Sequence, residues 1–285
     1  MRRSNPIPRL ATGLLAALAA VTASLFIAGP FLTTACAVEA DEVITVATGR
    51  VVDKVECKAD AGQSYALYVP SNYTPEKRWP VLYCFDPLAR GRVPVEQFRE
   101  AAEKYGYILA GSNNSQNGPN QNPVGAFTAM WKDTHARFAI DDKRVYATGF
   151  SGGARVATRL AILCKGCIAG VIACGAGFPP DLQPGQATAG ARFVYYATVG
   201  IDDYNFPELK NLDETLDALS IPHLVKAFTG AHQWPPASAC IEAIEWMEIE
   251  AIKANRRGRD ETLIAALFDK RMARAAEYER AGNLL

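Results

Sequence analysis

One serine lies in a setting that could make it a nucleophile. Residues 149–153 read Gly-Phe-Ser-Gly-Gly, a G-x-S-x-G motif between the strand-like run 145–148 and the helix-like run 154–163. A sharp strand-to-helix turn exposes the hydroxyl of Ser151 and requires small neighbours, because the backbone folds back on itself. The amide of Gly152 would then begin a helix, where negative charge is stabilised. By itself the motif is weak, since about one chain in a dozen of this composition would carry it by accident.

A serine hydroxyl also needs a base to accept its proton. Of the three histidines, His232 follows the last predicted strand, at the carboxyl edge of a parallel sheet where sites assemble. His135 is expected in a helix as a surface or capping residue, and His223 is expected to be structural at the start of a strand. A surface loop is the alternative interpretation of His232.

The base in turn needs an acid to orient it. The loop 200–205 follows the preceding strand and contains Asp202 and Asp203. With either one, the chain order is serine, acid, histidine, which distinguishes one lineage of triad enzymes from the others. Each aspartate has a structural alternative as a helix N-cap or an Asx-turn, so the residues alone leave the acid open.

The elements that must position these groups alternate between strand and helix. Strands are predicted at 43–55, 63–69, 81–85, 107–111, 144–148, 168–173, 193–199 and 224–228, the first two as a hairpin. Helices are predicted at 95–105, 124–138, 154–163, 207–219, from an N-cap at Ser238 to 254, and at 261–281. Alternation of this kind favours an α/β fold: a mostly parallel central sheet with helices on both faces, in three layers.

These patterns together resemble the α/β-hydrolase superfamily, and within it secreted esterases of the polyhydroxybutyrate-depolymerase and feruloyl-esterase type. The resemblance covers about residues 63–250. It is carried by the elbow 149–153, the run 141–146 before it, the G-x-x-D at 200–203 and the G-x-H-x-W-P at 230–235. The elbow and histidine motifs are each weak alone, but together they are specific for this superfamily.

The resemblance implies a serine hydrolase that cleaves a small or polymeric carboxylic ester through an acyl-enzyme, without a metal or organic cofactor. Ser151 would be the nucleophile, His232 the base and Gly152 an oxyanion donor. The G-x-x-D spacing favours Asp203 over Asp202 as the acid. The alternatives are a peptidase or thioesterase with the same triad, or a non-catalytic binding protein on the same scaffold.

One loop departs from the family pattern. The related families commonly have His-Gly after the third strand, where this chain has Asp86-Pro87-Leu88. Proline has no N–H to donate, so the second oxyanion donor is expected to be the amide of Leu88, with Ala89 as the alternative. An ion pair between Asp86 and Arg90 that holds this loop is an equally good interpretation of those residues.

Three side chains are candidates for substrate contacts. Tyr204 and Trp234 each lie within two residues of a proposed triad member and would form an aromatic wall. Asn114 belongs to the polar run 113–120, which follows the fourth strand to the same edge, although a solvated turn explains this run as well. Trp131 is expected in the core.

The first 37 residues read as an export signal. Three arginines precede the apolar run 10–28, and Ala-Cys-Ala at 35–37 is typical of a cleavage site. The alternatives are an uncleaved membrane anchor, a lipid on Cys36, and a twin-arginine signal at Arg2-Arg3, which fits less well. The chain is therefore predicted to be periplasmic or secreted, with membrane association through this segment as the alternative.

The remaining sequence is divided into a catalytic domain at 43–254 and a C-terminal helical extension at 255–285. The formal net charge is zero and no basic stripe occurs, so no nucleic-acid partner is expected. The oligomeric state is left open.

Seven cysteines suit an oxidising compartment. Cys164 and Cys167 form a C-x-x-C without the partners that zinc requires, so a local disulfide is expected at the end of the helix after Ser151. Cys84 and Cys174 lie in or beside apolar runs and are expected to be buried free thiols.

Overall fold

The computed structural model describes residues 47–119, 121–182 and 192–282. The predicted export signal, at 1–37, lies outside these residues. Among the helices of the described segments, none is both long enough and apolar enough to span a bilayer.

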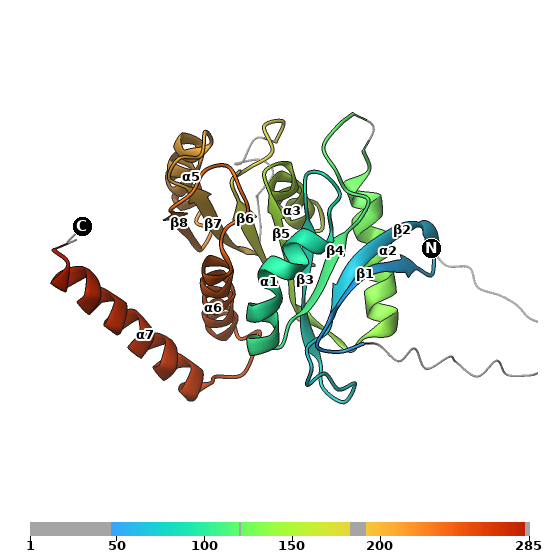
Figure 1. The fold of residues 1–285 in the computed structure, drawn as a ribbon, viewed down its shortest axis with the longest axis horizontal. Helices are drawn as coiled ribbons and strands as arrows, with labels where there is room; N and C mark the ends of the chain where they lie inside the picture. Colours follow the sequence, from blue (N-terminus) through green and yellow to red (C-terminus); the bar gives the residue numbers. More distant parts are fainter. Residues whose placement is uncertain (1–46, 120, 183–191, 283–285) are drawn as a thin grey trace, which may run out of the picture. The chain divides into compact units, whose positions relative to one another are not determined.

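Eight strands form one sheet in the order β1-β2-β4-β3-β5-β6-β7-β8 (Figure 1). Their bounds are β1 Val51–Cys57, β2 Asp60–Tyr68, β3 Trp79–Phe85, β4 Ile108–Ser112, β5 Ile140–Phe150, β6 Gly170–Cys174, β7 Val194–Gly200 and β8 His223–Phe228. β1 and β2 form the predicted antiparallel hairpin, and β2 also pairs antiparallel with β4. All other pairs are parallel, so the carboxyl ends of β3 to β8 share one edge.

Helices cover both faces of this sheet. Their bounds are α1 Arg92–Tyr105, α2 Pro123–Arg137, α3 Gly152–Leu163, α5 Phe206–Ala218, α6 Ala237–Lys253 and α7 Glu261–Arg280. α1 and α6 contact each other on one face, and their apolar residues share a core cluster that excludes those of α2, α3 and α5. The predicted three-layer α/β architecture is therefore confirmed.

Strand β3 shows how one strand serves two cores. Successive side chains of a strand point to opposite faces. Val81, Tyr83 and Phe85 belong to the cluster under α2, α3 and α5. Leu82 and Cys84 belong to the cluster under α1 and α6. Burial on both faces explains why the strand is a continuous apolar run, as parallel central strands usually are.

Most predicted elements are confirmed, with shifts at their ends. β1 begins at Val51, and residues 47–50, which were predicted as strand, are not. The N-cap predicted at Ser238 is wrong: α6 begins at Ala237 after an extended Pro236, and no side chain caps it. Proline supplies a suitable φ before a helix, so this start does not depend on a hydroxyl.

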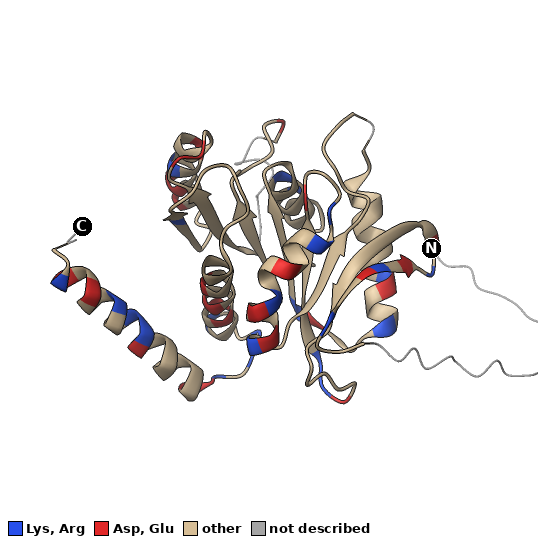
Figure 2. Cartoon of the chain, in the orientation of Figure 1, with Lys and Arg blue, Asp and Glu red and all other residues tan. Residues whose placement is uncertain are grey.

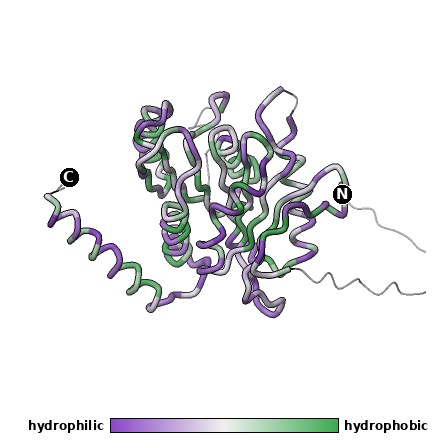
Figure 3. Tube along the Cα trace, in the orientation of Figure 1, coloured by the Kyte–Doolittle hydropathy of each residue, from purple (hydrophilic) through white to green (hydrophobic). Residues whose placement is uncertain are grey.

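α7 is the predicted C-terminal helix, and it contacts α6 through charged side chains. Lys270 pairs with Glu245 at 2.7 Å, and Arg274 pairs with Glu242. Only Leu267 of this helix is buried. Figure 2 shows basic and acidic residues interspersed along it, and Figure 3 shows how its mixed hydropathy contrasts with the apolar central strands.

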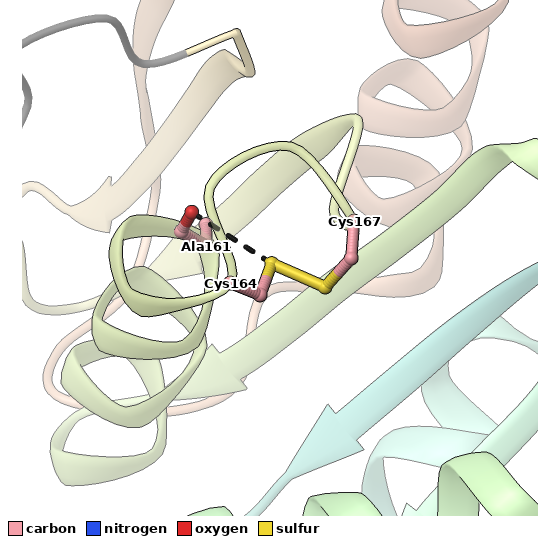
Figure 4. The surroundings of a disulfide bond; sticks show 3 residues. All are labelled: Ala161, Cys164 and Cys167. Atoms are coloured by element: carbon pink, nitrogen blue, oxygen red, sulfur yellow. Dashed lines mark hydrogen bonds between the residues drawn. A yellow bond between two sulfur atoms is a disulfide. The ribbon is translucent and has the colours of Figure 1, made fainter. Parts of the chain in front are cut away.

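The predicted disulfide is present at the far end of α3 from Ser151. Cys164 and Cys167 are bonded, and the Sγ of Cys164 lies 3.9 Å from the carbonyl oxygen of Ala161 (Figure 4). Cys84 and Cys174 are buried free thiols, as predicted. Cys57 and Cys240 are also free and buried.

Candidate active site

Ser151 occupies a strained turn between β5 and α3. Its φ of 52° and ψ of −120° place a non-glycine residue in a region that L-residues rarely adopt. Its N–H donates to the carbonyl of Cys174 at 2.8 Å, which fixes the turn against the end of β6. A Cβ at Gly149 would collide with the backbone of Gly153, so the chain reverses in a space that only glycine permits. This is the geometry of a nucleophile elbow.

The structure brings Ser151, His232 and Asp203 together in a line of hydrogen bonds. The Nε2 of His232 lies 3.0 Å from the Oγ of Ser151, and its Nδ1 lies 2.9 Å from each carboxylate oxygen of Asp203. A carboxylate at Nδ1 holds the proton on that nitrogen, which leaves the lone pair of Nε2 directed at the serine hydroxyl. This is the arrangement by which a serine hydroxyl is activated.

The two candidate acids are separated by burial. Asp203 is only 4% exposed, and its Oδ1 also accepts a hydrogen bond from the N–H of Asn205 at 2.8 Å. Asp202 is exposed, and its N–H donates to the carbonyl of Gly230. The latter bond ties the loop after β7 to the histidine loop, so Asp202 helps to bring His232 over Asp203 without facing it.

Two aromatic rings pack against the imidazole of His232. The ring centroid of Phe150 lies 4.6 Å from it and that of Tyr204 lies 4.2 Å from it. Phe150 is buried, whereas Tyr204 is 72% exposed. Tyr204 therefore lies where the aromatic wall was expected, at the open side of the histidine.

The amides expected to act as oxyanion donors lie in two different settings. The amide of Gly152 is the first of α3, and the first N–H groups of a helix have no acceptor within it. The amide of Leu88 instead donates to the Oδ1 of Asp86 at 2.9 Å, and that of Ala89 donates to the Asp86 carbonyl at 3.1 Å. Both amides predicted for the second donor are thus engaged within their own turn.

Asp86 is the centre of that turn. It is 1% exposed, and the guanidinium of Arg90 binds both of its carboxylate oxygens, at 2.9 and 3.0 Å. Burial alone would raise its pKa. Hydrogen bonds from Arg90, from the indole of Trp234 and from the amide of Leu88 outweigh that effect and hold the pKa of Asp86 below its ordinary value. The structural ion pair considered for this loop is present.

Two of the candidate substrate residues serve the scaffold in this structure. Trp234 is only 8% exposed, and its Nε1 donates to the Oδ2 of Asp86 at 2.9 Å, so its indole does not form an open wall. Asn114 accepts from the N–H of Ser64 at 2.8 Å and donates to the carbonyl of Gly62 at 2.9 Å, which ties its loop to β2. Both side chains have their polar atoms engaged by the protein.

One group among the described residues has side chains near enough to hold a metal ion. It consists of Asp213, Asp217 and His223, from α5 and the start of β8. The two carboxylates are exposed, and the Nε2 of His223 lies 3.2 Å from the Oδ1 of Asp213, a contact that needs no metal ion. His223 and His232 flank opposite ends of β8, so this group is separate from Ser151.

Several solved structures share this architecture. The fluorophosphonate-binding serine hydrolase F of Staphylococcus aureus matches 70% of this chain and 99% of its own at 12% identity, with a TM-score of 0.56. A ferulic acid esterase matches 70% and 97% at 16% identity, also with a TM-score of 0.56. An esterase of Pyrobaculum calidifontis matches 72% and 87% at 11% identity, with a TM-score of 0.55.

No protein-family model and no curated protein matches the sequence itself. At 11–16% identity the structural likeness is one of fold. The strand order, the layers and these structures lead to the same conclusion: the chain has the α/β-hydrolase fold.

Proposed function

We propose that this protein is a serine hydrolase that cleaves a carboxylic ester. The observation that carries the proposal is the continuous hydrogen-bonded line from Ser151 through His232 to Asp203, at 3.0 and 2.9 Å. On a strained elbow, such a line of hydrogen bonds can activate the serine hydroxyl for attack on a carbonyl carbon. The structures of similar fold are described as esterases or serine hydrolases, which supports the same reaction class.

In the proposed reaction, the Oγ of Ser151 attacks the ester carbonyl while Nε2 of His232 accepts the hydroxyl proton. Asp203 stabilises the resulting imidazolium. The tetrahedral oxyanion accepts a hydrogen bond from the amide of Gly152, and its collapse expels the alcohol, which takes the proton from His232. Water then attacks the acyl-enzyme by the same proton route and releases the acid. The balanced result is ester plus water giving alcohol plus acid, and these steps use only groups of the chain.

The surroundings of the proposed nucleophile favour an ester with an apolar group. Three large hydrophobic side chains are exposed on loops at the carboxyl edge of the sheet: Leu88 at 63%, Ile201 at 52% and Tyr204 at 72%. Exposed apolar residues that gather around polar groups are typical of a ligand site. Polyhydroxybutyrate and feruloyl esters remain the two specific candidates that the sequence resemblance suggests.

We also propose that the protein works outside the cytoplasm. The apolar run 10–28 and the cleavage-like 35–37 support export. The disulfide between Cys164 and Cys167 supports an oxidising compartment. Mass analysis of the protein from the cell envelope and the medium, compared with the cytoplasm, tests this proposal.

Steady-state hydrolysis tests the reaction class. The wild type should hydrolyse p-nitrophenyl acetate or butyrate, and Ser151→Ala should lose this activity while keeping its circular dichroism spectrum. A panel of feruloyl esters, polyhydroxybutyrate, a thioester and a peptide amide then identifies the substrate class. Equal activity of Ser151→Ala and wild type would contradict the proposal.

A further inference from the structure

The side chain of Asn117 lies in the place where a side chain on Gly152 would be. A Cβ built on Gly152 would have Cγ and Nδ2 of Asn117 at 2.6 and 2.7 Å, with Oδ1 closer still. A carbon–carbon bond adds about 1.5 Å, so Nδ2 lies within about 4 Å of the Gly152 Cα. The carboxamide of Asn117 therefore borders Gly152, the residue whose amide is the donor proposed to face the oxyanion.

The backbone of two loops fixes this position. The N–H of Asn117 donates to the carbonyl of Pro87 at 2.9 Å. Next to it, Gln116 and Leu88 form an antiparallel bridge. The polar loop after β4 is thereby paired with the turn after β3, and both lie beside the N-terminus of α3. The main chain of Asn117 is therefore held beside the elbow, and its position does not depend on hydrogen bonds of its own side chain.

The carboxamide of Asn117 is available, unlike that of Asn114. Both polar atoms of Asn114 are hydrogen-bonded to the backbone of β2. Asn117 is exposed, and within residues 47–119, 121–182 and 192–282 no hydrogen bond engages its side chain. A half-turn about its Cβ–Cγ bond exchanges the amide oxygen and nitrogen, so a negative charge beside it would select the nitrogen as the nearer atom.

We propose that Asn117 is a catalytic residue whose Nδ2 donates a hydrogen bond to the oxyanion, together with the amide of Gly152. This inference rests on the proposed ester hydrolysis and assigns the second donor of that same site. It resolves the difficulty that the amides of Leu88 and Ala89 are engaged by Asp86. A donor that meets the oxygen only as it becomes negative stabilises the transition state more than the substrate.

The test compares three variants with wild type on p-nitrophenyl acetate. Asn117→Ala should lower kcat about 10²–10³-fold, the usual cost of one oxyanion donor, with KM changed less than about threefold. Asn117→Asp should lower kcat at least as much, because a carboxylate there would repel the negative charge that develops on the oxygen. The matched control is Gln116→Ala, which shortens an exposed neighbour whose pairing with Leu88 is made by the backbone; it should stay within about twofold of wild type.

A transition-state analogue separates catalysis from structure. Phenylboronic acid forms a bond from boron to the Oγ of Ser151, and the resulting tetrahedral anion imitates the intermediate. Asn117→Ala should weaken its inhibition by about the same factor as it lowers kcat, whereas loss of fold alone would lower the active fraction and leave the inhibition constant unchanged. Thermal unfolding of each variant should match that of the control.

The variant Gly152→Ala tests the role of Asn117 independently. Its methyl group would displace the carboxamide of Asn117, so the losses of kcat in Gly152→Ala and Asn117→Ala should not add in the double variant. If wild type is inactive on every ester tested, the proposed function fails. If wild type is active and Asn117→Ala resembles Gln116→Ala, the function stands and this inference is wrong.

Discussion

The indole of Trp234 and the carboxylate of Asp86 are joined by a hydrogen bond of 2.9 Å, although 148 positions separate the two residues in the chain. Trp234 lies two residues after His232, and Asp86 begins the turn after β3 that borders the elbow. The bond thus ties the loop of the proposed base to the loop beside the proposed nucleophile. The position of His232 depends on both.

Removal of this bond should cost stability. Trp234→Phe keeps most of the buried ring and leaves the Oδ2 of a buried Asp86 without its indole donor, which should lower the free energy of unfolding by about 1–3 kcal/mol. Urea unfolding measures this change. The matched control is Trp246→Phe: Trp246 is 7% exposed, and its indole makes no hydrogen bond within the described residues. Equal losses in the two variants would show that the bond contributes nothing.

Asp86 should also make the protein sensitive to acid. Because hydrogen bonds hold its pKa below the ordinary 3.8 in the folded protein, the unfolded chain takes up the proton first as the pH falls. The stabilisation is complete above that ordinary value and is lost as the pH falls through the lower, folded value. The difference in unfolding free energy between wild type and Asp86→Asn should therefore shrink below about pH 4. Urea titrations from pH 7 to pH 3 test this, and a difference independent of pH would contradict it.

Two neighbouring glycines of the elbow should respond differently to the same methyl group. A Cβ at Gly153 would meet the backbone carbonyl of Phe85 in β3, which cannot move away. Gly153→Ala should therefore cost about 1–3 kcal/mol or more. The three atoms nearest to a Cβ at Gly152 all belong to the side chain of Asn117, which can rotate, so Gly152→Ala should cost less than about 1 kcal/mol. The reverse order of stability, measured by thermal unfolding, would contradict the structure of the elbow.

The disulfide should contribute modestly to stability and nothing to catalysis. Cys164 and Cys167 close a loop with a sequence separation of only 3, and such a short loop is worth about 2 kcal/mol at most. Replacement of both cysteines by serine should lower stability by up to that amount and leave kcat unchanged, because the bond lies at the far end of α3 from Ser151. A large loss of kcat in a folded variant would contradict this prediction and show that the two ends of α3 are coupled.

The sequence predicts those parts of the fold and the site whose signal lies in a short local pattern of residues. Ser151 and His232 could be located because each follows an apolar strand in a loop of recognisable composition. Asp203 was distinguished from Asp202 only by spacing, and the structure separates the two by burial. The strands of the sheet core were similarly evident, since burial on both faces leaves a continuous apolar run.

What the sequence did not predict depends on contacts between distant loops. The amide of Leu88 is engaged because Asp86 is held in place by Trp234, far along the chain. Within the polar run 113–120 the sequence does not single out Asn117, because its contact with Gly152 exists only when the loop after β4 lies next to the elbow. The one signal for this contact in the sequence is that a residue without a side chain, Gly152, directly follows the proposed nucleophile.

His232 and Asp203 are proposed to activate Ser151. The most direct test of this activation is reaction of the wild-type protein with a fluorophosphonate, followed by mass analysis of its peptides. One covalent adduct is expected, on the Oγ of Ser151, formed far more slowly in His232→Ala and absent in Ser151→Ala. An unlabelled wild type, or an adduct on another residue that persists in Ser151→Ala, would contradict it.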